Sequence, residues 1–190
     1  TEPSPLELDL TINNPVCNNG NDGSIIAEVL GGTGSHIYQL SDSAFNVISN
    51  SYLSENLSAG DYSLTVTDEN DCELIESFEL DDPNAIIIQI NTTDPSCYLG
   101  SNGSATFTSL NAVGNVTQVW SSVVALGDYV PLSFDDTLSE LSAGNYRIEL
   151  TDSLGCSQSE IFSISEANQI EVDIITTPSE CSNTSGASAQ

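Results

Sequence analysis

The stretch LSAGDYSLTVTDENDC occupies residues 57–72 and returns as LSAGNYRIELTDSLGC at residues 141–156. Two copies of this length do not arise by chance, so the chain is an array of repeats. Each copy contains a turn, a strand with alternating apolar residues, a second turn and a cysteine. The rest of the sequence can be aligned against these two copies.

Three segments with an apolar residue at every second position begin successive copies, at residues 6–10, 86–90 and 170–174. A period of two indicates a strand with one buried face. An acidic residue followed by Pro or Ala precedes each segment and predicts a short, stiff joint where Pro is present. We therefore predict a first β-sandwich repeat at 1–82, a second at 83–166 and the first strands of a truncated third repeat at 167–190.

The charge of the chain excludes several classes of function. Acidic residues number 28 against a single basic residue, Arg147, and the formal net charge is −27. Binding to nucleic acid or to anionic lipid requires a basic face, so neither is expected. No apolar run is long enough to span a membrane, and we predict no membrane insertion. The chain also has no methionine and no signal peptide, which we interpret as a segment from the middle of a longer secreted protein.

Each repeat contains roughly six or seven short strands with Gly-rich turns and no helix signal. This pattern predicts an all-β protein of tandem immunoglobulin-like antiparallel β-sandwich modules. The spacing L-x-x-G-x-Y predicts a tyrosine corner at Tyr62 and again at Tyr146. Trp120 lies in a predicted strand, where we expect it to be buried in the core.

The cysteines occur two to a repeat, which suggests one disulfide per repeat and an oxidising, extracellular compartment. The predicted bonds are Cys17–Cys72 and Cys97–Cys156, and Cys181 would have its partner outside the chain. Antiparallel strands bring two cysteines to the same end only when an even number of strands lies between them. We count four strands, whereas five would separate the cysteines. The alternative is a pair of buried free thiols in each repeat.

The composition argues against an enzyme, because His36 is the only histidine and its counterpart is Val116. The aspartates that open the last hairpin turn, Asp68 and Asp152, are predicted to cap their own backbone. No cofactor is expected, with the exception of a Ca²⁺ ion that Asp81 and Asp82 could hold at the joint between repeats.

The two copies diverge most in the segment before residue 57 or 141, which predicts surface loops with room for one or two short strands. Tyr129 and Phe134, in the longer loop of the second copy, are candidates for a surface contact such as carbohydrate binding.

The order Cys, D/N-G-S, G-G-T-G, aromatic strand, L-S-A-G-x-Y, V-T-D, x-x-C and acid-Pro resembles the SprB-type repeat of very large surface adhesins in gliding Bacteroidota. The resemblance extends over both repeats and the start of a third. The first copy departs from it at Leu40, where the family usually has the tryptophan seen at Trp120, and the second lacks the double glycine.

The resemblance implies a filament on the bacterial cell surface, exported by the type 9 secretion system and carried along the surface during gliding. Its expected partners are an extracellular surface or polysaccharide, the neighbouring repeats, and secretion and gliding machinery outside this chain. The alternative is a carbohydrate-binding or spacer module of a secreted multidomain enzyme. Bacteroidota also O-glycosylate Asp-Ser/Thr motifs, which makes Ser43, Thr137 and Ser153 candidate sites.

Overall fold

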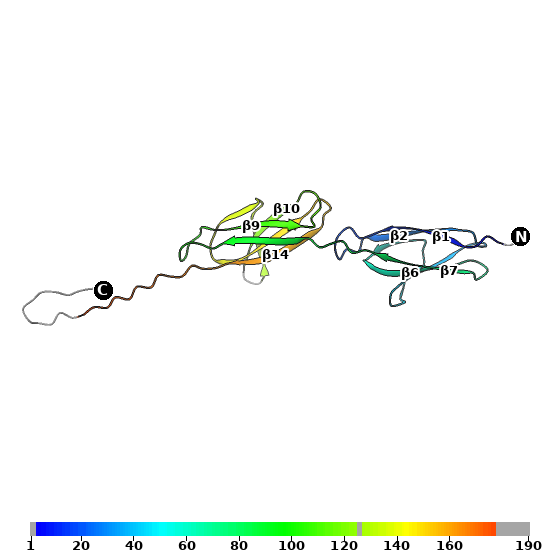
Figure 1. Ribbon diagram of the computed structural model, residues 1–190, viewed down its shortest axis with the longest axis horizontal. Coiled ribbons are helices and arrows are strands. Elements are labelled where there is room, and N and C mark those ends of the chain that lie inside the picture. The colour runs from blue at the N-terminus through cyan, green and yellow to red at the C-terminus, as the bar shows by residue number, and fades with distance from the viewer. Residues whose placement is uncertain (1–2, 125–126, 178–190) are drawn as a thin grey trace, which may run out of the picture. The chain divides into compact units, whose positions relative to one another are not determined.

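The computed structural model describes residues 3–124 and 127–177 of the chain (Figure 1). This part contains fourteen strands, β1 to β14, and no helix. The prediction of an all-β, immunoglobulin-like fold is confirmed.

The first seven strands form two antiparallel sheets, ordered β1-β2-β5 and β4-β3-β6-β7. Leu8 and Leu10 of β1 are half-buried and alternate with exposed residues, as a period of two requires. The bounds are β1 Glu7–Asn13, β2 Gly23–Leu30, β3 Ile37–Asp42, β4 Val47–Ser49, β5 Leu53–Leu57, β6 Gly60–Thr67 and β7 Glu73–Leu80. We call these seven strands the first strand set.

The remaining seven strands, the second strand set, repeat this order as β8-β9-β12 and β11-β10-β13-β14. Their bounds are β8 Ile87–Thr93, β9 Gly103–Leu110, β10 Thr117–Val123, β11 Tyr129–Ser133, β12 Thr137–Leu141, β13 Gly144–Thr151 and β14 Ser157–Ile164. Each set falls inside one predicted repeat, although the predicted boundaries at residues 82 and 166 stay predictions. The divergent segment contains two short strands in each set, β4 and β5 or β11 and β12, in keeping with the one or two strands predicted there.

The predicted strand over residues 170–174 does not form. Ile170, Val172 and Ile174 are exposed. In the other two copies this strand pairs with the strand that follows the cysteine loop. The corresponding residues here follow Cys181, outside the described part of the chain.

The density of contacts divides the chain into two compact units. The first contains residues 1–89, 108–119 and 148–160, and so includes the whole first strand set and one end of the second. The second contains residues 90–107, 120–147 and those from 161 onward.

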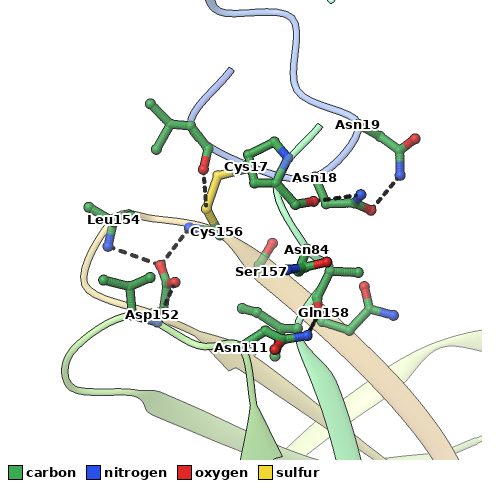
Figure 2. A pocket seen from close by; sticks show the side chains of 15 residues that line it. Cys17, Asn18, Asn19, Asn84, Asn111, Asp152, Leu154, Cys156, Ser157 and Gln158 are labelled. Atoms are coloured by element: carbon green, nitrogen blue, oxygen red, sulfur yellow. Dashed lines mark hydrogen bonds between the residues drawn. A yellow bond between two sulfur atoms is a disulfide. The ribbon is translucent and has the colours of Figure 1, made fainter. Parts of the chain in front are cut away.

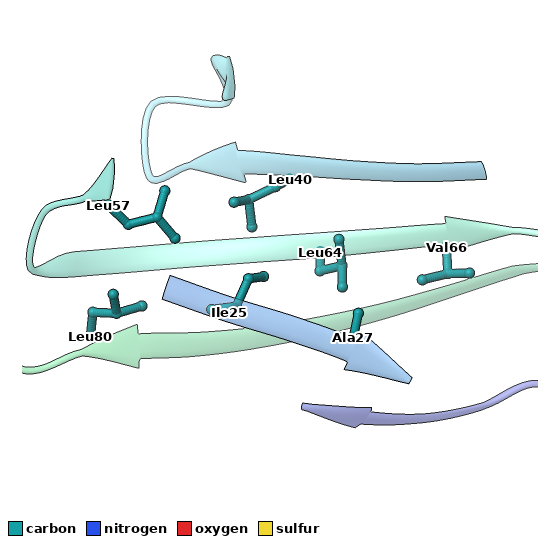
Figure 3. Close-up of a cluster of buried hydrophobic side chains, with 7 residues drawn as sticks. All are labelled: Ile25, Ala27, Leu40, Leu57, Leu64, Val66 and Leu80. Atoms are coloured by element: carbon teal, nitrogen blue, oxygen red, sulfur yellow. The ribbon is translucent and has the colours of Figure 1, made fainter. Parts of the chain in front are cut away.

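The core of the first strand set lies between its two sheets (Figure 3). One sheet contributes side chains from β2 and β5, and the other contributes side chains from β3, β6 and β7. The buried residues are Ile25, Ala27, Leu40, Leu57, Leu64, Val66 and Leu80.

The second core uses the same positions with a different distribution of volume. Trp120 takes the place of Leu40 and is fully buried, as we predicted from its strand position. On the other sheet, Ala105 takes the place of Ile25. Phe107 stands at the position of Ala27, and its ring packs edge-on against Trp120 with the ring centroids 5.9 Å apart. Aromatic contacts thus replace aliphatic ones in this core. The departure from the family pattern at Leu40 is therefore a change in core packing.

We expect Ile148→Ala to lower the free energy of unfolding of the second strand set by about 2–5 kcal/mol, because it leaves a cavity in a closed core. Ile148 is completely buried, whereas Ile161 is 55% exposed. Ile161→Ala is the matched control and should change stability by less than about 0.5 kcal/mol. Trp120 is the only tryptophan, so its fluorescence during urea denaturation reports on this set. Equal losses in both variants would contradict the assigned core.

Candidate functional site

The cysteine loop after the first strand has the same geometry in both strand sets. The backbone N–H of Gly20 donates to the Cys17 carbonyl over 2.8 Å, and Gly100 donates to Cys97 over 2.9 Å. The side chain of Asp22 accepts a hydrogen bond from the backbone of Val16, a role taken by Asn102 in the second set. The turn dipeptides Asp-Gly and Asn-Gly therefore hold each cysteine on the same tight turn.

This loop also binds the segment that leaves the last strand. One carboxylate oxygen of Asp82 accepts a hydrogen bond from the Asn19 backbone, and the other accepts one from the Asn18 amide, both over 2.9 Å. In the second set the backbone of Leu99 donates to Glu166. The acidic residue of the acid-Pro or acid-Ala joint therefore fixes the cysteine loop to the exit of its own repeat.

A second turn that both strand sets share is the hairpin between their last two strands. Asp68 is buried and accepts hydrogen bonds from the backbone of Asn70 and Cys72 on Oδ1, and from Thr33 on Oδ2. Asp152 makes the same three contacts, to Leu154, Cys156 and Val113. Each aspartate caps its own hairpin, as we predicted, and in addition joins it to the turn between the second and third strands of its set.

These hydrogen bonds stabilise the charged form of both aspartates. The backbone N–H of Cys72 makes the largest contribution to lowering the pKa of Asp68 below its ordinary value. The backbone N–H of Val113 does the same for the pKa of Asp152. Burial opposes the shift in each case, so the backbone donors outweigh desolvation.

The structure contains a disulfide between Cys17 and Cys156, whose Cα atoms are 5.3 Å apart (Figure 2). Both residues belong to the first compact unit. Cys72 and Cys97 are exposed free thiols, so the predicted bonds Cys17–Cys72 and Cys97–Cys156 are both wrong. Cys181 lies outside the described residues.

The number of strands explains this correction. Five strands, β2 to β6, separate Cys17 from Cys72, so the two cysteines lie at opposite ends of the first strand set. The eight residues of β7 run between these ends, a length of about 25 Å at the rise of a strand. A disulfide requires a Cα separation of about 4.4–6.8 Å. The predicted count of four includes only one strand in the divergent segment, where the structure has two, β4 and β5.

A groove of about 360 Å³ adjoins the disulfide. Figure 2 shows the cysteine loop on one side of it and the hairpin of Asp152 on another. The joint segment 83–86 and the turn at 111–113 complete the lining. Asn111 has a positive φ of 64°, the conformation that Gly31 supplies in the first set, and its amide donates to the Ala85 carbonyl. The second repeat therefore keeps this turn even though it lacks the double glycine.

Asp81 and Asp82, the candidate Ca²⁺ ligands, hydrogen-bond to asparagines of the neighbouring loop. Asp81 accepts from the Asn14 amide, and both carboxylate oxygens of Asp82 are used as described above. Within residues 3–124 and 127–177, no three acidic, histidine or cysteine side chains are grouped as a metal site would require. Binding of Ca²⁺ stays a prediction, which melting in EDTA and in excess Ca²⁺ would test.

The other candidate residues are spread over the chain. Tyr129 belongs to β11 and is 44% exposed, with the Arg147 guanidinium 4.6 Å from its ring centroid. Phe134 follows the strand and is 71% exposed. His36 is half-buried immediately before β3, and its Nε2 lies 3.3 Å from the Gly31 carbonyl. Tyr129 and Phe134 are therefore each exposed to solvent, whereas His36 packs against a turn.

Both tyrosines of the repeated stretch make the hydrogen bond of a tyrosine corner. The Tyr62 hydroxyl donates to the Ser58 carbonyl over 2.8 Å, and Tyr146 donates to Ser142 over 2.9 Å. Burial raises the pKa of both phenols. These tyrosines are structural residues that close one end of each set.

The candidate glycosylation sites are all exposed. Ser43 lies in the turn between β3 and β4, and Thr137 begins β12. The Ser153 hydroxyl donates to the Val113 carbonyl over 2.6 Å, so a glycan there would have to replace this bond.

Residues 10–45 match the SprB repeat. This stretch therefore has the sequence pattern of a SprB-type repeat. The matched residues run from the end of β1 through the cysteine loop and β2 to the turn after β3. No curated protein sequence matches the chain.

Several solved structures are similar in fold. Three N-terminal domains of the highly immunogenic outer capsid protein of bacteriophage RB49 align at 18% identity and a TM-score of 0.46, over 84% of this chain and 59% of that one. The N-terminal eight Ig domains of Down syndrome cell adhesion molecule align at 15% identity and a TM-score of 0.37, over 84% and 24%. A tetra-tandem repeat from the extending region of a large adhesion protein aligns at 15% identity and 0.27, over 84% and 50%. The chain thus spans 59% or less of each, and the likenesses say nothing about function.

No helix that is long and apolar enough to cross a membrane occurs among the described residues.

We expect the oxidised chain to contain the bond Cys17–Cys156 and to react with N-ethylmaleimide at Cys72 and Cys97 after denaturation. Peptide mapping by mass spectrometry without reduction distinguishes this pattern from bonds within each repeat. Cys181→Ser removes the remaining thiol and simplifies the map. A peptide linking Cys17 to Cys72 would contradict the structure.

We expect the second strand set to lose stability in acid partly through Asp152. The folded-state pKa of Asp152 lies below its unfolded value, so its contribution is complete above about pH 4 and is lost as the pH falls through the folded pKa. Asp152→Asn should lower the melting temperature at about pH 7 and make the fall toward about pH 3 smaller than in wild type. Exposed Glu160→Gln is the control, with Trp120 fluorescence as the readout. A variant that keeps the full wild-type acid dependence would show that Asp152 does not contribute to it.

Proposed function

We propose that the chain is a structural and adhesive segment of a very large secreted adhesin on a bacterial cell surface, without enzymatic activity. The observation that carries this proposal is the SprB repeat at residues 10–45, present in a chain whose two strand sets have the same order. A repeated sandwich with repeated turns is the architecture of an extended array.

The electrostatics of the chain support a role outside the cell and in contact with water. The net charge of −27 keeps repeats apart and suppresses lateral aggregation, although salt screens this repulsion beyond about 8–10 Å. Exposed strand edges are commonly protected from pairing by charged side chains, especially lysine. This chain has no lysine, so its carboxylates must provide that protection. The disulfide supports an oxidising compartment.

The resemblance extends this proposal to gliding motility and export by the type 9 secretion system. Residues that would contact the secretion or gliding machinery belong to parts outside this chain. O-glycosylation at Ser43, Thr137 and Ser153 belongs to the same proposal, and an intact mass equal to that of the bare sequence in protein from the native source would exclude it.

Ligand contact is assigned to Tyr129 and Phe134. Both are exposed, and β11 is an edge strand of its sheet. Solvent-exposed aromatic rings are a common surface for contact with sugars and apolar ligands. The same observation favours the second candidate function, a carbohydrate-binding or spacer module of a secreted enzyme.

We expect beads coated with the chain to be retained on polysaccharide surfaces. The double variant Tyr129→Ala/Phe134→Ala should lose about tenfold or more in affinity if the pair is the contact, since buried aromatic anchors contribute most of such binding. Phe45→Ala is the matched control, because Phe45 is 89% exposed in a turn of the first strand set.

Glycan arrays identify the ligand, and Trp120 fluorescence verifies the fold of each variant. Equal binding by the double variant and by Phe45→Ala would contradict the assigned contact. Absence of binding to every glycan and surface would contradict the adhesive role.

A further inference from the structure

The first strand set has a groove at the position that corresponds to the groove beside the disulfide. It measures about 410 Å³ and is lined by residues 3–6, 32–33 and 68–74. The groove beside the disulfide is lined by the counterparts of these residues at 83–86, 111–113 and 152–158. The two grooves are therefore the same surface of the repeat, seen once in each strand set.

The grooves differ in one respect. Val16, Cys17, Asn18 and Asn19 of a cysteine loop contribute to the groove of the second strand set (Figure 2). No cysteine loop within residues 3–124 and 127–177 lines the groove of the first set. At the groove that the loop covers, Ile86 is 7% exposed, whereas its counterpart Leu6 in the first set is half-buried. Cys156 is half-buried there, whereas its counterpart Cys72 is exposed. The free groove thus has an unused cysteine and a less covered apolar residue.

The second strand set has the matching loop in a free state. Cys97 lies on the same turn as Cys17, with the hydrogen bond to its carbonyl from Gly100 in place of Gly20. The loop is fixed to Glu166 as the Cys17 loop is fixed to Asp82. Cys97 is exposed and unbonded. Among the described residues there is therefore one occupied pair of loop and groove, one free groove and one free loop of the same kind.

We propose that the groove at Cys72 is a docking site for the cysteine loop of a further copy of this repeat, and that the loop at Cys97 docks in the same way on a following copy. Cys72 and Cys97 are the halves of disulfides that link consecutive repeats head to tail. The occupant is a loop with the architecture of residues 95–100, because the corresponding loop occupies the equivalent groove in this structure. Such a heterologous contact does not close on itself and so extends into an array.

The covalent step is an ordinary oxidation. Two thiols, one on the loop and one beside the groove, lose two protons and two electrons and form one S–S bond. The electrons reduce a disulfide oxidant, either a small-molecule disulfide such as oxidised glutathione or a thiol oxidoreductase, to two thiols. Within a natural array the joint would hold the two cysteines at high effective concentration.

The test uses the full chain with Cys181→Ser, concentrated in a buffer of reduced and oxidised glutathione. We expect multimers of two, three and more chains that dithiothreitol dissolves. Peptide mapping should find Cys72 linked to Cys97 between chains more often than random pairing of two thiols allows. Links formed at random among the two cysteines would overturn the proposal.

Complementary variants give the matched control. Cys72→Ser retains only the free loop thiol, and Cys97→Ser retains only the groove thiol. Neither should multimerise alone, whereas an equimolar mixture should give a dimer joined through the remaining pair. Dimers of either variant alone at the same yield as the mixture would overturn the proposal.

A third variant separates docking from thiol reactivity. Ser4→Trp places a large side chain in the groove and leaves Cys72 in place. We expect Cys72 in this variant to react with a small alkylating reagent under denaturing conditions, and the folded chain to lose at least tenfold in the yield of links. Unchanged linking would show that the groove is not the docking site. These outcomes do not depend on adhesion, so they leave the proposed function to its own test.

Discussion

The odd number of strands in each set is the constraint on which the rest of the structure depends. Seven antiparallel strands place the entry and the exit of the set at opposite ends. The loop after the first strand and the hairpin before the last strand are consequently at opposite ends too, and each has a cysteine. No bond can form between two such cysteines within one set. The chemistry of the cysteines is therefore directed outward, toward another copy of the repeat.

A few carboxylates hold the turns and loops of this fold together by accepting hydrogen bonds, which the strongly acidic composition alone does not reveal. Asp68 and Asp152 each accept three backbone hydrogen bonds and connect two turns. Asp82 fixes the cysteine loop through both of its oxygens. Other acids stand directly opposite one another across strands, as Asp9 and Glu28 do, and such pairs destabilise a sheet. The negative charge thus consists of a few structural groups and many solvated ones.

The sequence predicted the fold because the repeat shows which features are structural. Aligning the two copies was enough to predict the tyrosine corner at Tyr62 and the strand in which Tyr62, Leu64 and Val66 alternate. The disulfide was not, because its correct assignment depended on counting strands through the segment where the copies differ. Strands β4 and β5 are short, with three and five residues, and their alternation is too brief to show whether the segment contains one strand or two. One undetected strand reverses the end at which a cysteine lies, so local patterns could not determine the pairing.

The disulfide also changes which part of the polypeptide bears tension. A force applied at the two ends reaches Cys17 through β1 and passes directly to Cys156 and β14. The residues between the two cysteines, separated by 139 positions, lie off this path. Fully extended they would measure roughly 460–500 Å. While the disulfide is intact, these residues cannot add to the distance between the two ends of the chain. Unfolding of either core under load would therefore increase that distance very little.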